Sequence, residues 1–485
     1  MKKIFFAPIF ILISFASFCQ NIVGSWEGVL EIQGNKLPIV FHILKDTGQK
    51  YTASFDSPKQ NSFNNPCSNI IVGTDSVVLM MKTIKGRYDG KLNESNTKLT
   101  GKWSQAGYTF PLDMKKVGET PVTKKINRPQ TPHPPYPYKS EDVAYANLDK
   151  SIIFGATFTV PLPDPNVDYF RAPVYPTVIL ISGSGPQDRD ETLFGHKPFA
   201  VIADYLTRQG IAVLRVDDRG VGETTGDFSK STTADFAKDV EAGIKIIKSR
   251  ADVDTNSIGI IGHSEGGLIA PMLASARKDI HFIVLLAGPG VPIIDLMEQQ
   301  SADVMASAGI SAADILQYRP LYKKIVTSII KAKDSADAAN QAIAIFKNWQ
   351  AATPASTVIN TTAVKNEKEM IAFINGFINA VSSPWFKYFL QIVPANYLAK
   401  THCPVLALNG AKDIQVAAKQ NLTAIKTILE KNKNKNVTTL ERPGLNHLFQ
   451  HCKTCTVAEY AQLEETFDIE TLKIIGDWIK HGRIN

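Results

Sequence analysis

The chain has 485 residues, of which 44% are hydrophobic and 20% are charged. This ordinary globular mixture excludes general disorder, and the length predicts about three domains at roughly 150 residues each. The net charge of +7 is spread along the chain rather than gathered in a basic stripe, so no nucleic-acid partner is predicted, and five cysteines are too few for a disulfide scaffold.

The N-terminus has the pattern of a targeting segment. Two lysines precede an apolar run over residues 4–18, a layout typical of a secretory signal peptide. The run is shorter than the ~20 residues that span a bilayer. We expect residues 1–19 to be removed and the mature protein to be exported, periplasmic or extracellular, without a membrane span. A lipoprotein with lipidated Cys19 is the first alternative, which the bulky Phe18 disfavours, and a retained membrane anchor is the second.

Residues 20–118 show short runs of alternating polar and apolar residues, separated by turn residues. Runs such as 26–32 and 37–43 have period two, and no run of helical period interrupts them. This pattern predicts an all-β sandwich or small barrel. Six prolines then fall within residues 119–138, which favours an extended linker and places the domain boundary there.

From residue 139 onward, strands and helices alternate. Apolar runs predict strands at 177–181, 211–216, 257–262, 282–287 and 404–409, and helical patterns lie between them. A further strand is predicted at 437–441. This alternation predicts a mostly parallel sheet with helices on both faces over residues 139–485. The gap between the fourth and fifth strands is helical and far longer than an ordinary connection, so residues 289–402 are predicted to form a cap over the carboxyl edge of the sheet.

A sharp strand-to-helix turn carries the predicted nucleophile. The third buried strand runs directly into Gly262–His263–Ser264–Glu265–Gly266, and a helix follows. This is the G-x-S-x-G elbow, in which glycines allow a tight turn that exposes the serine hydroxyl. The context of strand, turn and helix favours Ser264 as a nucleophile over a serine in an inert turn.

A serine nucleophile needs a base, and the base needs a carboxylate that orients it. Asp413 and His447 each follow a later sheet strand, in the chain order that this architecture uses. The alternatives are that Asp413 is a turn former or helix cap, and that His447 is an ordinary loop histidine. The rival bases are His451, which lies further along the loop, His402, which precedes its strand, and His263, which lies inside the elbow.

An oxyanion hole requires two N–H donors aimed at the developing charge. The backbone N–H of Glu265, directly after the nucleophile, is one predicted donor. The other is expected from the glycine-rich loop after the first buried strand, where Ser184 is preferred and Gly183 is the alternative.

Five motifs together resemble the secreted two-domain α/β-hydrolases of the EstD esterase type. They are Gly183–Ser184–Gly185–Pro186–Gln187–Asp188–Arg189–Asp190, Asp217–Asp218–Arg219–Gly220–Val221–Gly222, Gly262–His263–Ser264–Glu265–Gly266–Gly267, Asn409–Gly410–Ala411–Lys412–Asp413 and Leu445–Asn446–His447–Leu448–Phe449–Gln450. The resemblance covers residues 140–485 and reaches the N-terminal region only weakly. It implies an α/β-hydrolase fold, carboxylesterase activity with related serine aminopeptidases, and Ser264, Asp413 and His447 as the triad. Asp218 and Arg219 look like a structural pair.

Potential metal ligands cluster beside the predicted base. His447, His451, Cys452 and Cys455 could form a zinc set. A disulfide between the two cysteines is preferred, because a metal on His447 would dismantle the triad. No metal and no cofactor are therefore predicted, and Cys67 and Cys403 stay unassigned.

Three functions compete. The first is a serine carboxylesterase that cleaves esters of small acyl substrates. The second is a serine exopeptidase that acts on short peptides and needs an acidic or carbonyl anchor for the free amine; Glu298, Asp303 and Asp314 of the cap are candidates. The third is a binding module with an inactive hydrolase part, and an intact triad argues against it. The sequence does not indicate the oligomeric state.

Overall fold

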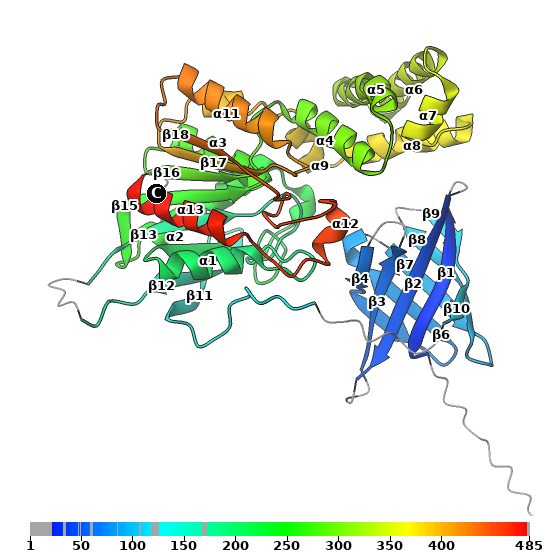
Figure 1. The fold of residues 1–485 in the computed structure, drawn as a ribbon, viewed down its shortest axis with the longest axis horizontal. Coiled ribbons are helices and arrows are strands. Elements are labelled where there is room, and N and C mark those ends of the chain that lie inside the picture. The colour runs from blue at the N-terminus through cyan, green and yellow to red at the C-terminus, as the bar shows by residue number, and fades with distance from the viewer. Residues whose placement is uncertain are drawn as a thin grey trace, which may run out of the picture. The chain divides into compact units, whose positions relative to one another are not determined.

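The computed structural model describes residues 22–482 except 33–34, 47, 49, 59–61, 85, 106–107, 118–125 and 167–171. The predicted signal segment, residues 1–19, lies outside the described residues. The chain divides into two compact units, Met1–Lys125 and Ile126–Asn485 (Figure 1). Residues 126–137, the second part of the predicted linker, therefore belong to the second unit, because Arg128 donates to Ala461 O at 2.8 Å and Gln130 to Phe467 O at 2.6 Å.

The N-terminal unit is a single antiparallel sheet that curls into a half-barrel. Its strands pair in the order β4-β3-β2-β1-β10-β8-β7-β6-β5, and β9 pairs with β8. Their bounds are β1 Gly24–Ile32, β2 Asn35–Lys45, β3 Tyr51–Ser57, β4 Ser62–Pro66, β5 Asn69–Val72, β6 Ser76–Met81, β7 Gly86–Leu92, β8 Lys98–Gln105, β9 Tyr108–Pro111 and β10 Met114–Lys116. Trp26, Phe41, Tyr88 and Trp103 are buried in its core. The predicted small β domain is confirmed, as one sheet rather than two packed sheets.

The second unit is built on an eight-stranded sheet of order β11-β12-β14-β13-β15-β16-β17-β18. Its strands are β11 Tyr138–Ala146, β12 Ile153–Pro161, β13 Tyr175–Ile181, β14 Ala212–Val216, β15 Val253–His263, β16 Phe282–Leu286, β17 Val405–Gly410 and β18 Val437–Arg442. The strands from β13 to β18 pair in parallel, whereas β11 and β12 form an antiparallel edge that the sequence reading did not anticipate.

Helices cover both faces of this sheet, as the continuous apolar strands predict. In β13, Val178 and Leu180 pack toward α1 (Pro198–Arg208) and α13 (Ile469–His481). The alternate residues Ile179 and Ile181 join the opposite core, which holds the other three helices: α2 Thr233–Lys248, α3 Glu265–Ala276 and α11 Ala418–Lys431. The predicted α/β fold is confirmed.

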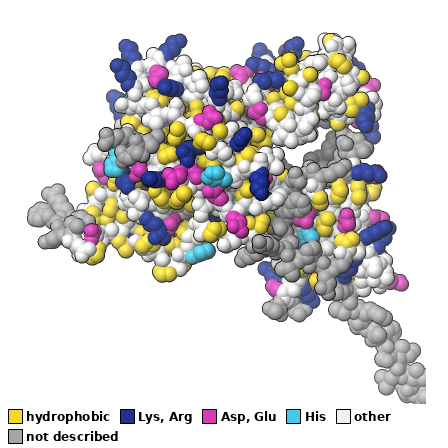
Figure 2. Space-filling model, in the orientation of Figure 1, with side chains coloured by type: hydrophobic (Ala, Val, Ile, Leu, Met, Phe, Trp, Pro, Cys, Tyr) yellow, Lys and Arg dark blue, Asp and Glu magenta, His cyan; other side chains and the backbone are white. Residues whose placement is uncertain are grey.

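Seven helices lie between β16 and β17, in the segment predicted to be a cap (Figure 1). They are α4 Ile293–Ser307, α5 Ala312–Lys331, α6 Ser335–Ala351, α7 Ala355–Thr362, α8 Glu367–Val381, α9 Pro384–Leu390 and α10 Ala395–Leu398. None of the helices in the described part of the chain is both long and apolar enough to cross a membrane. On the face shown in Figure 2, basic and acidic side chains are interspersed rather than gathered in one patch.

Candidate active site

Ser264 lies on a strained elbow between β15 and α3. Its backbone has φ 51° and ψ −114°, a region that residues other than glycine rarely adopt and that costs about 1–3 kcal/mol. A Cβ at Gly262 would collide with the Gly266 carbonyl, and one at Gly266 would collide with the Ile181 carbonyl. The glycines are therefore required for the turn to form at all, and the turn holds Ser264 at the carboxyl edge of the parallel strands.

The structure brings Asp413 and His447 into direct contact. Asp413 Oδ2 lies 2.7 Å from His447 Nδ1, and the two side chains are 0% and 5% exposed. The other oxygen of Asp413 accepts the backbone N–H groups of Gln415 and Val416 at 2.7 and 2.9 Å, which fixes the carboxylate. Since Nδ1 of His447 faces a carboxylate, Nε2 is the ring nitrogen left for proton exchange with a substrate or nucleophile.

Ser264 and His447 line the same cavity, of about 320 Å³. The cap contributes Leu296 and Met297 from α4 and three aromatic residues from α9, Trp385, Phe386 and Phe389. No lysine, arginine or aspartate is among the lining residues, and Glu191 is the single glutamate. The cavity thus offers a largely apolar wall opposite the hydroxyl and the imidazole.

The loop after β13 contains both N–H groups considered as the second oxyanion donor, those of Gly183 and Ser184, and one of them already has a hydrogen-bond acceptor. The N–H of Gly183 donates to Glu191 Oε1 at 2.7 Å. Ser184 is the next residue and also lines the cavity. Glu265 opens α3, and the first N–H groups of a helix have no partner within the helix. This geometry favours the N–H groups of Ser184 and Glu265 over that of Gly183 as oxyanion donors.

Glu191 was not identified from the sequence, yet it forms a buried ion pair behind the nucleophile. His263 Nδ1 lies 2.8 Å from Glu191 Oε1, and His263 Nε2 lies 3.1 Å from the carbonyl oxygen of His447. Both ring nitrogens face acceptor oxygens, an arrangement that favours the protonated form of the ring. Burial lowers the pKa of His263, but the Glu191 carboxylate and these hydrogen bonds outweigh burial and raise it overall. Both ring nitrogens of His263 are thus occupied by Glu191 and the His447 carbonyl, which disfavours it as a rival base.

The side chain of Glu265 is a second buried carboxylate at this edge. Burial raises its pKa, while hydrogen bonds from Thr233, Trp385 and Ser184 act in the opposite direction. Trp385 belongs to the cap and Thr233 is the first residue of α2.

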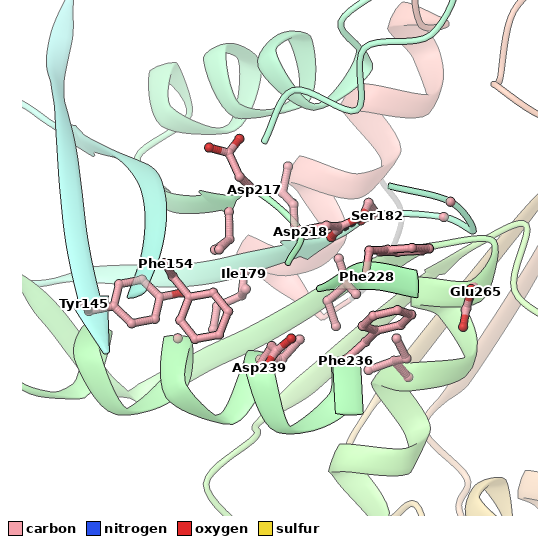
Figure 3. A pocket seen from close by; sticks show the side chains of 18 residues that line it. Tyr145, Phe154, Ile179, Ser182, Asp217, Asp218, Phe228, Phe236, Asp239 and Glu265 are labelled. Atoms are coloured by element: carbon pink, nitrogen blue, oxygen red, sulfur yellow. Dashed lines mark hydrogen bonds between the residues drawn. The ribbon is translucent and has the colours of Figure 1, made fainter. Parts of the chain in front are cut away.

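A smaller cavity of about 50 Å³ lies against the loop that contains Ser182 and Gly183 (Figure 3). Asp218 lines it and accepts the Ser182 hydroxyl at 3.0 Å and the Gln187 N–H at 2.8 Å. Burial raises the pKa of Asp218 to about 8. The expectation that Asp218 and Arg219 pair with each other is wrong, because Arg219 instead binds Asp239 on α2 at 2.7 Å.

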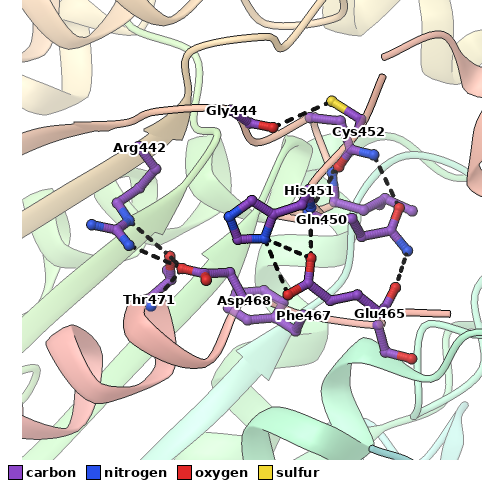
Figure 4. Close-up of polar contacts among 12 residues, drawn as sticks. Arg442, Gly444, Gln450, His451, Cys452, Glu465, Phe467, Asp468 and Thr471 are labelled. Atoms are coloured by element: carbon purple, nitrogen blue, oxygen red, sulfur yellow. Dashed lines mark hydrogen bonds and ion pairs between the residues drawn. The ribbon is translucent and has the colours of Figure 1, made fainter. Parts of the chain in front are cut away.

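The alternative zinc set is not assembled. Cys452 and Cys455 form a disulfide, and His451 pairs with Glu465 at 2.9 Å. In the described part of the chain, His451, Glu465 and Asp468 come within metal-ligand range of one another (Figure 4). Asp468, however, binds Arg442 at 3.0 Å, and a metal ion would have to displace that cation. Cys67 and Cys403 are free thiols, and burial raises the pKa of each to about 12.

The N-terminal unit holds a second Ser–His–Asp set that the sequence did not reveal. Ser25 Oγ lies 3.0 Å from His42 Nδ1, and His42 Nε2 lies 2.8 Å from Asp56 Oδ2. The three residues come from neighbouring strands of the sheet. Ser25 is only 2% exposed and lies within regular strand β1, so a substrate carbonyl does not reach it.

Comparisons with known proteins agree with this architecture. Residues 197–372 match the family described as serine aminopeptidase, S33. Esterase EstD of Thermotoga maritima is 35% identical over 126 residues, which are 26% of this chain and 30% of that protein. The chain therefore matches less than a third of that relative's length. The second unit has the α/β-hydrolase fold, and 126 of the chain's residues are similar to EstD.

Among solved structures, esterase Pf2001 of Pyrococcus furiosus has a TM-score of 0.41 at 17% identity, over 71% of this chain and 92% of that one. Est1E of Butyrivibrio proteoclasticus, with ferulic acid bound, has a TM-score of 0.35 at 16% identity, over 68% of this chain and 94% of that one.

Proposed function

We propose that the protein is a serine hydrolase that cleaves carboxylic esters of small acyl substrates. One observation carries the proposal: the strained Ser264 and His447, whose Nδ1 is held by Asp413, line one cavity. Nε2 of His447 takes the proton from the Ser264 hydroxyl while the oxygen attacks the ester carbonyl. The N–H groups of Ser184 and Glu265 stabilise the oxyanion that forms.

Collapse of this tetrahedral intermediate releases the alcohol, which receives the proton from His447, and leaves an acyl group on Ser264. Water, activated by His447 in the same way, then attacks the acyl-enzyme and releases the carboxylic acid. Asp413 stabilises the imidazolium in both steps and keeps its own negative charge.

The cavity favours an uncharged, apolar acyl or alkyl group over a peptide with a free amine. None of the three carboxylates considered as an amine anchor lines it. Glu298 is paired with Arg319, and Asp314 accepts hydroxyl and amide donors from Thr357 and Asn360. Asp303 accepts the amide of Gln299. The one lining glutamate, Glu191, already binds His263 and Gly183, so no uncommitted carboxylate among the lining residues is left for a free amine.

The test is a panel of p-nitrophenyl esters beside aminoacyl-p-nitroanilides, with a fluorophosphonate probe for the nucleophile. We expect ester hydrolysis and labelling in the full-length protein, and neither in Ser264→Ala. Ser25→Ala is the matched control, because Ser25 is the serine of the second Ser–His–Asp set and should keep both signals. Labelling that persists in Ser264→Ala would contradict the assignment, and hydrolysis of the anilides alone would favour the exopeptidase.

We further propose that the protein is exported. The Cys452–Cys455 disulfide supports this, since disulfides persist in oxidising compartments, as does the basic and apolar N-terminal pattern. Fractionation of the native host and mass spectrometry of the mature N-terminus test it, and a cytosolic protein that retains residues 1–19 would contradict it.

A further inference from the structure

The carboxylate of Glu265 joins three elements that meet beside the nucleophile. Thr233, at the start of α2, donates its hydroxyl to Oε1 at 2.7 Å. The indole N–H of Trp385, on cap helix α9, lies 2.9 and 3.0 Å from the two carboxylate oxygens. The side chain of Ser184, on the loop after β13, lies near the same carboxylate and acts to lower its pKa. Glu265 is 2% exposed, so bulk water does not replace a donor that is lost.

The same two residues supply the proposed oxyanion donors. The spacing between the N–H groups of Ser184 and Glu265 sets the geometry of the hole. The bonds from Thr233 and Trp385 fix the side chain of Glu265 and with it the start of α3, on one side of that spacing. Trp385 is also a wall of the cavity, where its ring stacks on Phe386 and Phe389 at centroid distances of 5.5 and 5.4 Å. A movement of α9 away from the sheet therefore breaks the indole bond to the carboxylate.

We infer that Glu265 is a positioning residue that couples the closed cap, through Trp385, to the geometry of the oxyanion hole. This inference rests on the proposed function. With the indole N–H in place, the carboxylate is held from the cap and from α2 together. Without it, the carboxylate turns, and the first turn of α3 shifts relative to Ser184. Substrate binding depends mainly on the apolar rings, which remain, whereas stabilisation of the oxyanion depends on the donor pair.

Two variants test the coupling. Trp385→Phe keeps an aromatic ring and removes the indole N–H, and Glu265→Gln keeps the shape of the side chain and removes its charge. The matched control is Trp349→Phe, which removes an indole hydrogen bond inside the cap, from Trp349 Nε1 to Gln317 O at 2.8 Å. On a short-chain ester we expect kcat to fall about ten-fold in the first two variants, with KM within about two-fold of the wild type. The control should match the wild type.

The double variant Trp385→Phe/Glu265→Gln gives a second measure. Because both changes weaken the same indole–carboxylate bond, the loss of kcat in the double variant should be smaller than the product of the two single losses. A boronic acid, which forms a tetrahedral anion on the nucleophilic serine, gives the third: its Ki should rise by the factor by which kcat/KM falls. A residue that only supported the fold would not shift this affinity selectively.

The inference is overturned if Trp385→Phe equals Trp349→Phe in kcat and in boronic-acid Ki, or if the effects of the two substitutions multiply. If Glu265→Gln does not fold, as judged by near-UV circular dichroism, the comparison of the two tryptophan variants decides alone. A wild type that hydrolyses no ester would overturn the proposed function and this inference together. An active wild type with an unaffected Trp385→Phe would overturn the coupling only.

Discussion

The buried Glu191–His263 pair gives the sharpest stability prediction. Glu191→Gln removes the charge that holds the His263 proton and that accepts the Gly183 N–H, at 2.8 and 2.7 Å. Two charge-assisted bonds contribute about 1.5–3 kcal/mol each, and removing one partner of a buried ion pair costs about 3–5 kcal/mol. Since the two estimates overlap, we expect the free energy of unfolding of the second unit to fall by about 3–5 kcal/mol.

The assay is urea unfolding followed by the loss of fluorophosphonate labelling at Ser264, which reports on the second unit alone. Glu465→Gln is the matched control, because Glu465 pairs with His451 at 2.9 Å but on the surface, so its loss should cost less than about 1 kcal/mol. The pKa of His263 is raised in the folded protein, so the pair contributes fully below the ordinary pKa of about 6.5 and is lost as the pH rises through the raised value. The difference between wild type and Glu191→Gln should thus be larger at pH 6 than at pH 10. A cost as small as that of Glu465→Gln, or one that grows with pH, would refute the reasoning.

Three further predictions concern stability, specificity and domain structure. Burial raises the pKa of Asp218 to about 8, so the free energy of unfolding of the wild type should fall as the pH rises from 5 to 9. Asp218→Asn, which mimics the protonated form, should lose less stability over this range. Parallel pH profiles of the two proteins in urea unfolding would contradict this. Phe389→Ala should enlarge the cavity and shift the substrate preference toward p-nitrophenyl esters with longer acyl chains. Phe373→Ala, in the cap core, should leave this preference unchanged. Identical chain-length profiles for the two variants would count against the cap as a wall of the site. The fragment 126–485 should hydrolyse short esters. It should also unfold at a higher urea concentration than the fragment 139–485, which lacks the hydrogen bonds from residues 126–137 to the C-terminal loop. Inactivity of the folded fragment 126–485 would show that the β unit completes the site.

A candidate site residue that follows a strand can be placed on the sheet from the sequence. Ser264, Asp413 and His447 each come after a parallel strand, and the carboxyl ends of such strands meet at one edge. Glu191 has no such signal, because it lies in the loop between β13 and α1 and its partner His263 is 72 residues away. The run of charged residues at 188–191, directly after the glycine loop, is the one feature that could have drawn attention to it.

The sequence predicts which segments form strands better than it predicts which strands pair with each other. In the N-terminal unit, period two indicates which side chains face the core, but it does not say which strands are neighbours, so a sandwich and a single curled sheet predict the same pattern. Strand β11 is an edge strand with mixed burial, and it lacks the continuous apolar run that identified the central strands. Helices α7, α9 and α10 were missed because each is eight residues or shorter.

Two buried carboxylates lie beside the loop after β13, and they depend on different parts of the protein. Glu191 accepts the Gly183 N–H directly and pairs with His263, which also bonds to the backbone carbonyl of His447. Glu265 accepts a hydrogen bond from Trp385 of the cap. A long acyl chain that packs on the α9 rings supplies binding energy that keeps the cap closed, and a short chain does not. The loss of kcat in Glu265→Gln should therefore shrink as the acyl chain lengthens, whereas the loss in Glu191→Gln should be the same for every ester. Equal chain-length dependence in the two variants would mean that the cap does not act through Glu265.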